Sequence, residues 1–164
     1  MQALFSDGRL VAAHTSVQAG QGLGGSAAAR LSVDHPRARF WATAVGEKLG
    51  WHGGLTMDYF HQDGEPVFIE CNPRTVEPGN AAASGVNLPL LSIALAAGRP
   101  LPDKVVTGRP GVRTRGTLAL LLGSADQTNS PRAVLRTLAA RRRGGMCSPT
   151  APKYSRQSSV THQA

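Results

Sequence analysis

Residues 68–80, FIECNPRTVEPGN, place a carboxylate, an amide and a guanidinium at alternate positions after an apolar run. That run predicts a β-strand. Alternate side chains of a strand share a face, so Glu70 and Asn72 are expected about 6.5 to 7 Å apart on one face. Their oxygen atoms suit Mg²⁺, which proteins commonly hold through one or two carboxylates and the phosphate oxygens of a nucleotide. Arg74, just past the strand, could neutralise a transferred phosphoryl group or an acyl phosphate. The competing interpretation is a charged strand end with solvated side chains.

A second strand is predicted just before this one, because the runs GLTMDYF and EPVFIECN flank HQDG, a pattern typical of a hairpin. Asp58, in the first run, can join Glu70 at a metal ion only if the two side chains share a face. A two-residue turn at Asp63-Gly64 would send Asp58 to the opposite face. We therefore predict a three-residue loop, Gln62 to Gly64, or a β-bulge with the same effect on parity. The predicted metal face carries Asp58, Glu70 and Asn72, and the other face carries Met57, Tyr59, Ile69 and Cys71.

The other elements complete an α+β protein, expected to be an antiparallel sheet with helices on one side. A hairpin is predicted around Asp7-Gly8, and a helix from Pro36 to a glycine cap at Gly50. Phe40 and Trp41 of that helix are expected in the core. Further helices are predicted over residues 88–98 and after Ser130, which is placed as an N-cap.

The stretch QAGQGLGGSAAAR spaces Gly20, Gly22 and Gly25 as G-x-G-x-x-G, a pattern that cradles pyrophosphate in dinucleotide-binding folds. Here a hairpin precedes the glycines and Pro36 follows them, whereas that fold requires a βαβ unit. A flexible connection is therefore favoured, with a position near phosphate left open.

Charge is distributed unevenly along the chain. The net charge is +8, but residues 1–98 hold six Lys/Arg and eight Asp/Glu, whereas residues 99–164 hold twelve and two. This break predicts a basic helical extension over residues 99–143 and a disordered tail over residues 144–164. The run Arg141 to Arg143 has no interleaved aromatic residues, so we do not expect a nucleic-acid site there.

Composition excludes several classes of protein. The sequence has no apolar run of about 18 residues and no basic-then-apolar leader, so we expect a cytoplasmic location and no membrane contact. Two cysteines, Cys71 and Cys147, are too few for a disulfide framework or a four-ligand zinc site. Both are expected to be structurally passive, with Cys71 in a buried strand.

The stretch GWHGGLTMDYFHQDGEPVFIECNPRTVEPGNAAASGVNLPLL, residues 50–91, resembles the C-terminal half of the ATP-grasp fold of biotin carboxylase, carbamoyl phosphate synthetase and D-alanine ligase type enzymes. The resemblance extends over about residues 1–98, which we interpret as a partial ATP-grasp domain. It implies that Asp58 and Glu70 hold Mg²⁺ (or Mn²⁺) with ATP, that Asn72 is a further ligand, and that Arg74 acts at the reacting phosphoryl group or acyl phosphate.

Enzymes of this family join a carboxylate to a nucleophile through an acyl phosphate while ATP is split. Their adenine pocket and phosphate-binding lysines lie in a preceding region, so a separate chain is expected to supply the N-terminal half. The resemblance implies an ATP- and Mg-dependent, ligase-like function on an unknown carboxylate substrate. Two alternatives stay open: a non-catalytic truncated remnant, and a basic-tailed adaptor that binds nucleic acid or an acidic partner.

Overall fold

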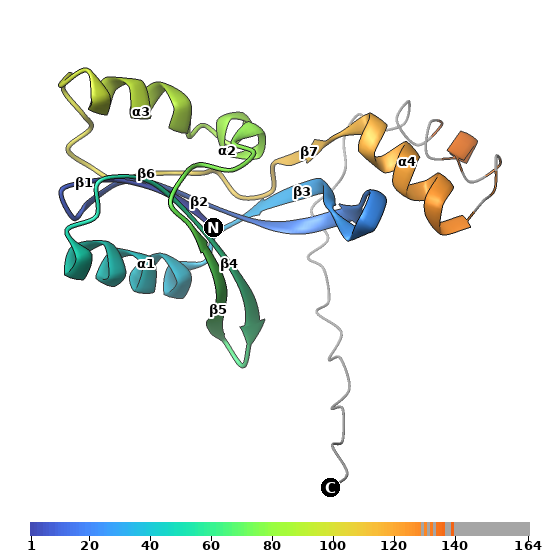
Figure 1. The fold of residues 1–164 in the computed structure, drawn as a ribbon, viewed down its shortest axis with the longest axis horizontal. Helices are drawn as coiled ribbons and strands as arrows, with labels where there is room; N and C mark the ends of the chain where they lie inside the picture. The colour runs from blue at the N-terminus through green and yellow to red at the C-terminus, as the bar shows by residue number, and fades with distance from the viewer. Residues whose placement is uncertain (129, 131, 133, 137–138, 140–164) are drawn as a thin grey trace, which may run out of the picture.

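A computed structural model describes residues 1–128, 130, 132, 134–136 and 139. Its centre is a seven-stranded sheet in the order β5-β4-β1-β2-β3-β7, with β6 paired to β2 beside this path (Figure 1). The β2–β6 pair is parallel and the other pairs are antiparallel. The strands are β1 Gln2–Ser6, β2 Arg9–Gln21, β3 Ala27–Val33, β4 Gly53–Gln62, β5 Glu65–Asn72, β6 Val106–Thr107 and β7 Arg113–Arg115. The predicted α+β class is therefore confirmed.

The helices cover both faces of the sheet, not one. Their bounds are α1 Pro36–Leu49, α2 Gly79–Ala83, α3 Leu88–Ala96 and α4 Thr117–Thr128, with a short 3₁₀ helix, η1, at Leu23–Gly25. Helix α1 packs on one face through Ala38 and Ala42, in a buried cluster with Phe5 and Met57. On the opposite face Leu88 of α3 contributes to a second cluster, and Figure 1 shows α1 and α3 on opposite sides of the strands. None of the helices in the described part of the chain is long and apolar enough to span a membrane.

Local signals explain the elements nearest the site. The β1–β2 turn is Asp7-Gly8 with φ of 48° and 85°, as a tight hairpin with two left-handed residues requires. Helix α1 starts with Pro36 in its first turn and stops at Gly50, whose φ of 58° suits glycine best. The predictions for this turn and this helix are confirmed.

Two aromatic residues predicted in the core are exposed instead. Phe40 and Trp41 of α1 are 56% and 42% exposed. Their rings contact each other, and Arg37 lies over both at 5.7 Å from each ring centroid. Trp41 and Arg37 also bind Glu65, with Trp41 Nε1 3.2 Å and Arg37 Nε 2.7 Å from its carboxylate oxygens. The aromatic pair therefore ties α1 to the tip of the β4–β5 hairpin rather than filling the core.

The glycine-rich stretch forms the β2–β3 connection and packs against α4. A Cβ on Gly123 would lie 2.7 Å from Cα of Gly22, so the two backbones approach more closely than side chains would permit. Gly24 and Gly25 have φ of 63° and 80°, which the tight reversal requires. Close packing and turn geometry account for the spacing of these glycines.

The basic range 99–143 is more than a helical extension. Residues 106–107 and 113–115 form β6 and β7, which join the same sheet as residues 1–72, and α4 follows. Buried Ser32 and Asn80 help to hold this segment: Ser32 Oγ donates to the Arg109 carbonyl at 2.7 Å and Asn80 Nδ2 to the Val112 carbonyl at 3.2 Å. The sequence did not indicate these two strands. The tail predicted over residues 144–164 and most of the helix predicted after Ser130 lie outside the described residues.

Candidate functional site

The β4–β5 hairpin has a two-residue turn with a bulge. Asp63 and Gly64 have φ of 50° and 88°, and Gln62 pairs with Glu65, so the predicted three-residue loop is wrong. Between the pairs Tyr59–Phe68 and Asp58–Glu70 the register shifts, which leaves Ile69 as the extra residue. The predicted alternative, a bulge that restores parity, is therefore confirmed.

This bulge places the candidate ligands on one face. Asp58 opposes Glu70, and Thr56 opposes Asn72, so all four side chains lie on the same face of the hairpin. Met57 and Tyr59 point the other way, into the cluster beneath α1. Cys71 opposes Met57 but is exposed, because β5 is an edge strand, so the expectation of a buried cysteine is wrong.

Asp58 and Glu70 form a pair of directly opposed carboxylates. Both are exposed, and neither takes part in an ion pair with the described residues. Like charges placed opposite each other on neighbouring strands are destabilising, and a cation between them offsets that repulsion. Asn72 Nδ2 donates to Glu70 Oε1 at 2.9 Å, which orients that carboxylate.

These donors fit a divalent cation that is shared with a nucleotide. In the described part of the chain no group of three or more His, Cys, Asp or Glu side chains is placed to hold a metal ion. Two carboxylates and an amide are thus too few for an all-protein cage, but they match a Mg²⁺ site that phosphate oxygens complete.

Arg74 lies in the loop between β5 and α2, and this loop is fixed against β4. Thr56 is 5% exposed, and its hydroxyl donates to the Arg74 carbonyl at 2.8 Å and accepts from the Val76 amide at 3.2 Å. A side-chain amide of Gln2 donates to the Val76 carbonyl. Gly54 lacks a side chain where a Cβ would lie 2.8 Å from Thr75 Oγ1. The backbone of Arg74 is therefore held near the face that carries Asp58 and Glu70, and Arg74 is exposed.

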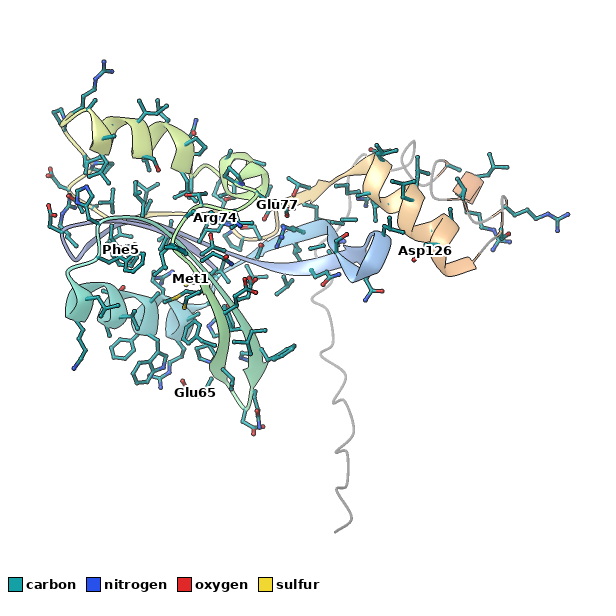
Figure 2. The ribbon with its side chains drawn as sticks, in the orientation of Figure 1. Met1, Phe5, Glu65, Arg74, Glu77 and Asp126 are labelled. Atoms are coloured by element: carbon teal, nitrogen blue, oxygen red, sulfur yellow. The ribbon has the colours of Figure 1, made fainter. Side chains whose placement is uncertain are left out.

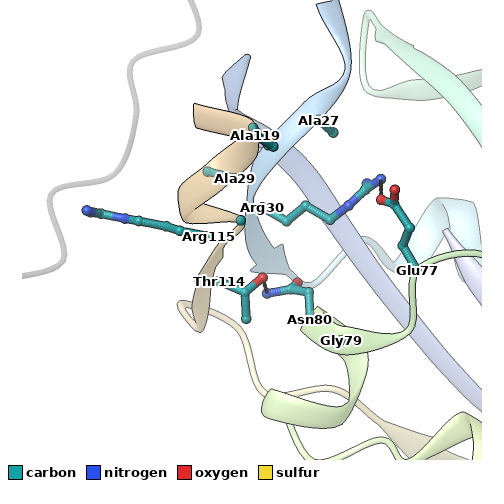
Figure 3. Close-up of a pocket in the computed structure, with 11 residues that line it drawn as sticks. Ala27, Ala29, Arg30, Glu77, Gly79, Asn80, Thr114, Arg115 and Ala119 are labelled. Carbon is teal, nitrogen blue, oxygen red and sulfur yellow. Dashed lines mark hydrogen bonds and ion pairs between the residues drawn. The ribbon is translucent and has the colours of Figure 1, made fainter. Parts of the chain in front are cut away.

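A second charged feature, which sequence reasoning missed, lies beyond this loop. Glu77 forms an ion pair with Arg30 of β3 at 2.8 Å, beside a cavity of about 370 Å³ (Figure 3). Asn80 and Thr114 line the same cavity and are linked by a hydrogen bond of 3.0 Å. Figure 2 shows Arg74 and Glu77 in the same region of the molecule, next to α2. Glu77 lies within the stretch of residues 68–80 discussed above, but no local sequence pattern indicated its pairing with Arg30, 47 residues away.

A buried histidine neighbours Asn80, one of the residues that line this cavity. His14 is 3% exposed, and neither ring nitrogen has a hydrogen-bond partner among the described residues. Burial, with a smaller contribution from the N-terminal amine, lowers the pKa of His14 to about 4, while the neighbouring Asn80 opposes the shift. His14 is therefore neutral near pH 7 and adds no positive charge near Arg30.

Comparison with known proteins gives one informative result. No protein-family model matches the chain. Over 96 residues, 55% of the chain, it is 32% identical to a protein named acetyl-CoA carboxylase from Dictyostelium discoideum. The chain is a distant, partial relative of that protein. The match covers only 4% of the length of that carboxylase, so the match does not assign the activity or substrates of the carboxylase to this chain.

Proposed function

We propose that this chain provides the C-terminal half of an ATP-grasp active site, which binds Mg-ATP and activates a carboxylate as an acyl phosphate when an N-terminal half completes it. The observation that carries the proposal is the bulge at Ile69, because it places Asp58 and Glu70 opposite each other on one exposed face of the hairpin. A bulge beside a functional site commonly re-aims a side chain. The partial match to an acetyl-CoA carboxylase supports the proposal, since biotin carboxylase is among the enzymes that the sequence resembles.

In this proposal each residue has a distinct task. Asp58 and Glu70 hold the cation, Asn72 orients Glu70 and adds an oxygen donor, and Arg74 faces the reacting phosphoryl group. The bound cation would neutralise phosphate charge and orient the nucleotide. The cavity beside Arg30 and Glu77 is the candidate location for the carboxylate substrate, because a substrate carboxylate can compete with the exposed Glu77 for the Arg30 guanidinium.

An apolar surface adjoins the carboxylates and suits a nucleobase. Phe60 and Val67 oppose each other one pair beyond the Tyr59–Phe68 pair, and they are 67% and 45% exposed. Phe60 lies two residues from Asp58 on the same strand, so it shares the metal face. Nucleotide sites combine apolar surface for the base with a few polar groups that fix orientation.

Titration calorimetry of Mg-ATP, with and without the product of the neighbouring upstream reading frame, tests the proposal. We expect the chain alone to show no saturable ATP hydrolysis, because enclosure of the adenine and phosphate-binding lysines belong to the other half. We expect Mg-ATP binding to weaken at least tenfold in Glu70→Gln and in Asp58→Asn. The matched control is Asp103→Asn, which removes an exposed carboxylate on the connection before β6.

The outcomes separate the candidate functions. If Glu70→Gln and Asp58→Asn bind Mg-ATP as tightly as the Asp103→Asn control, the proposed metal site is wrong. Binding without turnover, even beside the upstream product, favours the non-catalytic remnant. Salt-dependent DNA binding that is lost on deleting residues 132–143 would favour the basic-tailed adaptor.

A further inference from the structure

We propose that the edge of the β3–β7 pair, on the side that carries Arg113 and Arg115, binds a small organic anion with an apolar body, of the aromatic carboxylate class. The proposal does not depend on the Mg-ATP site, because Asp58, Glu70 and Arg74 do not line this cavity, although the cavity shares Ala29, Arg30, Thr114 and Arg115 with the Arg30–Glu77 cavity. It rests on two arginines that form no ion pair with the described residues, on the cavity that they line, and on the apolar wall of that cavity.

Strand parity places the two arginines together. In the β3–β7 ladder Thr114 opposes Arg30, while Arg113 opposes Leu31 and Arg115 opposes Ala29. Thr114 and Arg30 point toward α2, where they contact Asn80 and Glu77. Arg113 and Arg115 therefore lie on the opposite face, and Figure 3 shows Arg115 extending away from Glu77.

A cavity of about 240 Å³ lies against these arginines. Its apolar wall comes from Ala19 of β2, Ala29 of β3 and Leu120 of α4. Leu120 is held over this face because Gly20 has no side chain: a Cβ there would lie 3.0 Å from Leu120 Cδ2. Helix α4 thus closes one side of the cavity.

The charge around the cavity is of one sign. Arg30, Arg113 and Arg115 line it, and no described Asp or Glu does. Arg30 is already paired with Glu77, whereas Arg113 and Arg115 are exposed and form no ion pair with the described residues. Alternate residues on a strand are about 6.5 to 7 Å apart, so a carboxylate between the two guanidiniums can accept charge-assisted hydrogen bonds from both.

The cavity size selects the ligand class. A cavity of about 150 Å³ accommodates benzene, and pockets for drug-sized ligands are usually about 300 Å³ or larger. At about 240 Å³, the cavity suits one ring or a short branched chain, with the anionic group at the arginine rim. A nucleotide is too large for it.

Benzoate titrated into the ¹⁵N-labelled chain, followed by amide chemical shifts, is the test. We expect saturable shifts at millimolar benzoate for the amides of Ala19, Ala29 and residues 113–115. Benzyl alcohol, which lacks the charge, and inorganic phosphate, which lacks the apolar body, should each bind at least tenfold more weakly. These two probes separate the contributions of the arginines and of the apolar wall.

Variants test each part of the site. Arg113→Gln and Arg115→Gln should each weaken benzoate binding at least fivefold, and the double variant should abolish it. Ala19→Leu, which fills the cavity and keeps both charges, should also abolish it. The matched control Arg99→Gln removes an exposed arginine in the loop after α3 and should bind benzoate like the unchanged chain. Shifts that map to another surface, or unchanged binding by the double variant, would overturn the proposal.

Discussion

Replacing Thr56 by valine tests how the loop that carries Arg74 is held. Valine preserves the shape of the side chain, so the change removes the hydroxyl and leaves packing nearly intact. Two hydrogen bonds are lost: the one donated to the Arg74 carbonyl at 2.8 Å and the one accepted from the Val76 amide at 3.2 Å. Both bonds fasten residues 74–76 to β4.

The magnitude follows from what is left unpaired. An unsatisfied buried backbone group costs about 1 to 3 kcal/mol. Thr56 is 5% exposed, but Arg74 is exposed and Val76 only half-buried, so water can replace part of each bond. We therefore expect the free energy of unfolding to fall by about 2 kcal/mol, which is closer to the cost of one unpaired buried group than of two. We also expect weaker Mg-ATP binding, because the loop that carries Arg74 becomes less ordered.

Thr43→Val is the matched control. The hydroxyl of Thr43 donates to the Arg39 carbonyl at 2.8 Å, one turn earlier in α1. That carbonyl also accepts a backbone hydrogen bond within the helix, so removal of the hydroxyl leaves no buried group unpaired. Its unfolding free energy should change by less than about 0.5 kcal/mol. Urea unfolding followed by tryptophan fluorescence measures both variants, and equal losses in the two would refute the reasoning.

Two further predictions concern the core and its response to pH. Gly46→Ala should lower the free energy of unfolding by about 1 to 3 kcal/mol in urea, because the added Cβ would overlap the Phe5 ring. Gly79→Ala is the control: its Cβ would meet nothing within 4 Å, so the variant should be neutral or slightly stabilised. A Gly46→Ala variant as stable as the unchanged chain would contradict the packing of α1 on β1. Burial lowers the pKa of His14 to about 4, below its unfolded value, so the unfolded chain binds the proton first. The free energy of unfolding should therefore fall by about 3 kcal/mol as pH drops from about 6.5 to about 4, and His14→Gln should remove that part of the pH dependence.

The sequence determined most of the local structure around the site. Asp7-Gly8 and Asp63-Gly64 each form a tight turn, because aspartate tolerates and glycine favours a positive φ. Pro36 and Gly50 fixed the ends of α1 for similarly local reasons. The need for Asp58 to share a face with Glu70 could also be derived from the alternation of side chains, and it led to the predicted bulge.

Only the tertiary structure decided how parity was restored and what lies around the carboxylates. Turn chemistry favoured a two-residue turn, and the extra residue moved to Ile69, which no local pattern marked. The pairing of Arg30 with Glu77 depends on the order of strands in the sheet, as does the placement of Arg113 and Arg115 on the far face. Phe40 and Trp41 follow the apolar pattern of a buried helix, yet the core beneath α1 is filled by Phe5 and Met57 from the sheet. Hydrophobicity records that a side chain can be buried, whereas the elements that pack beside it determine whether it is.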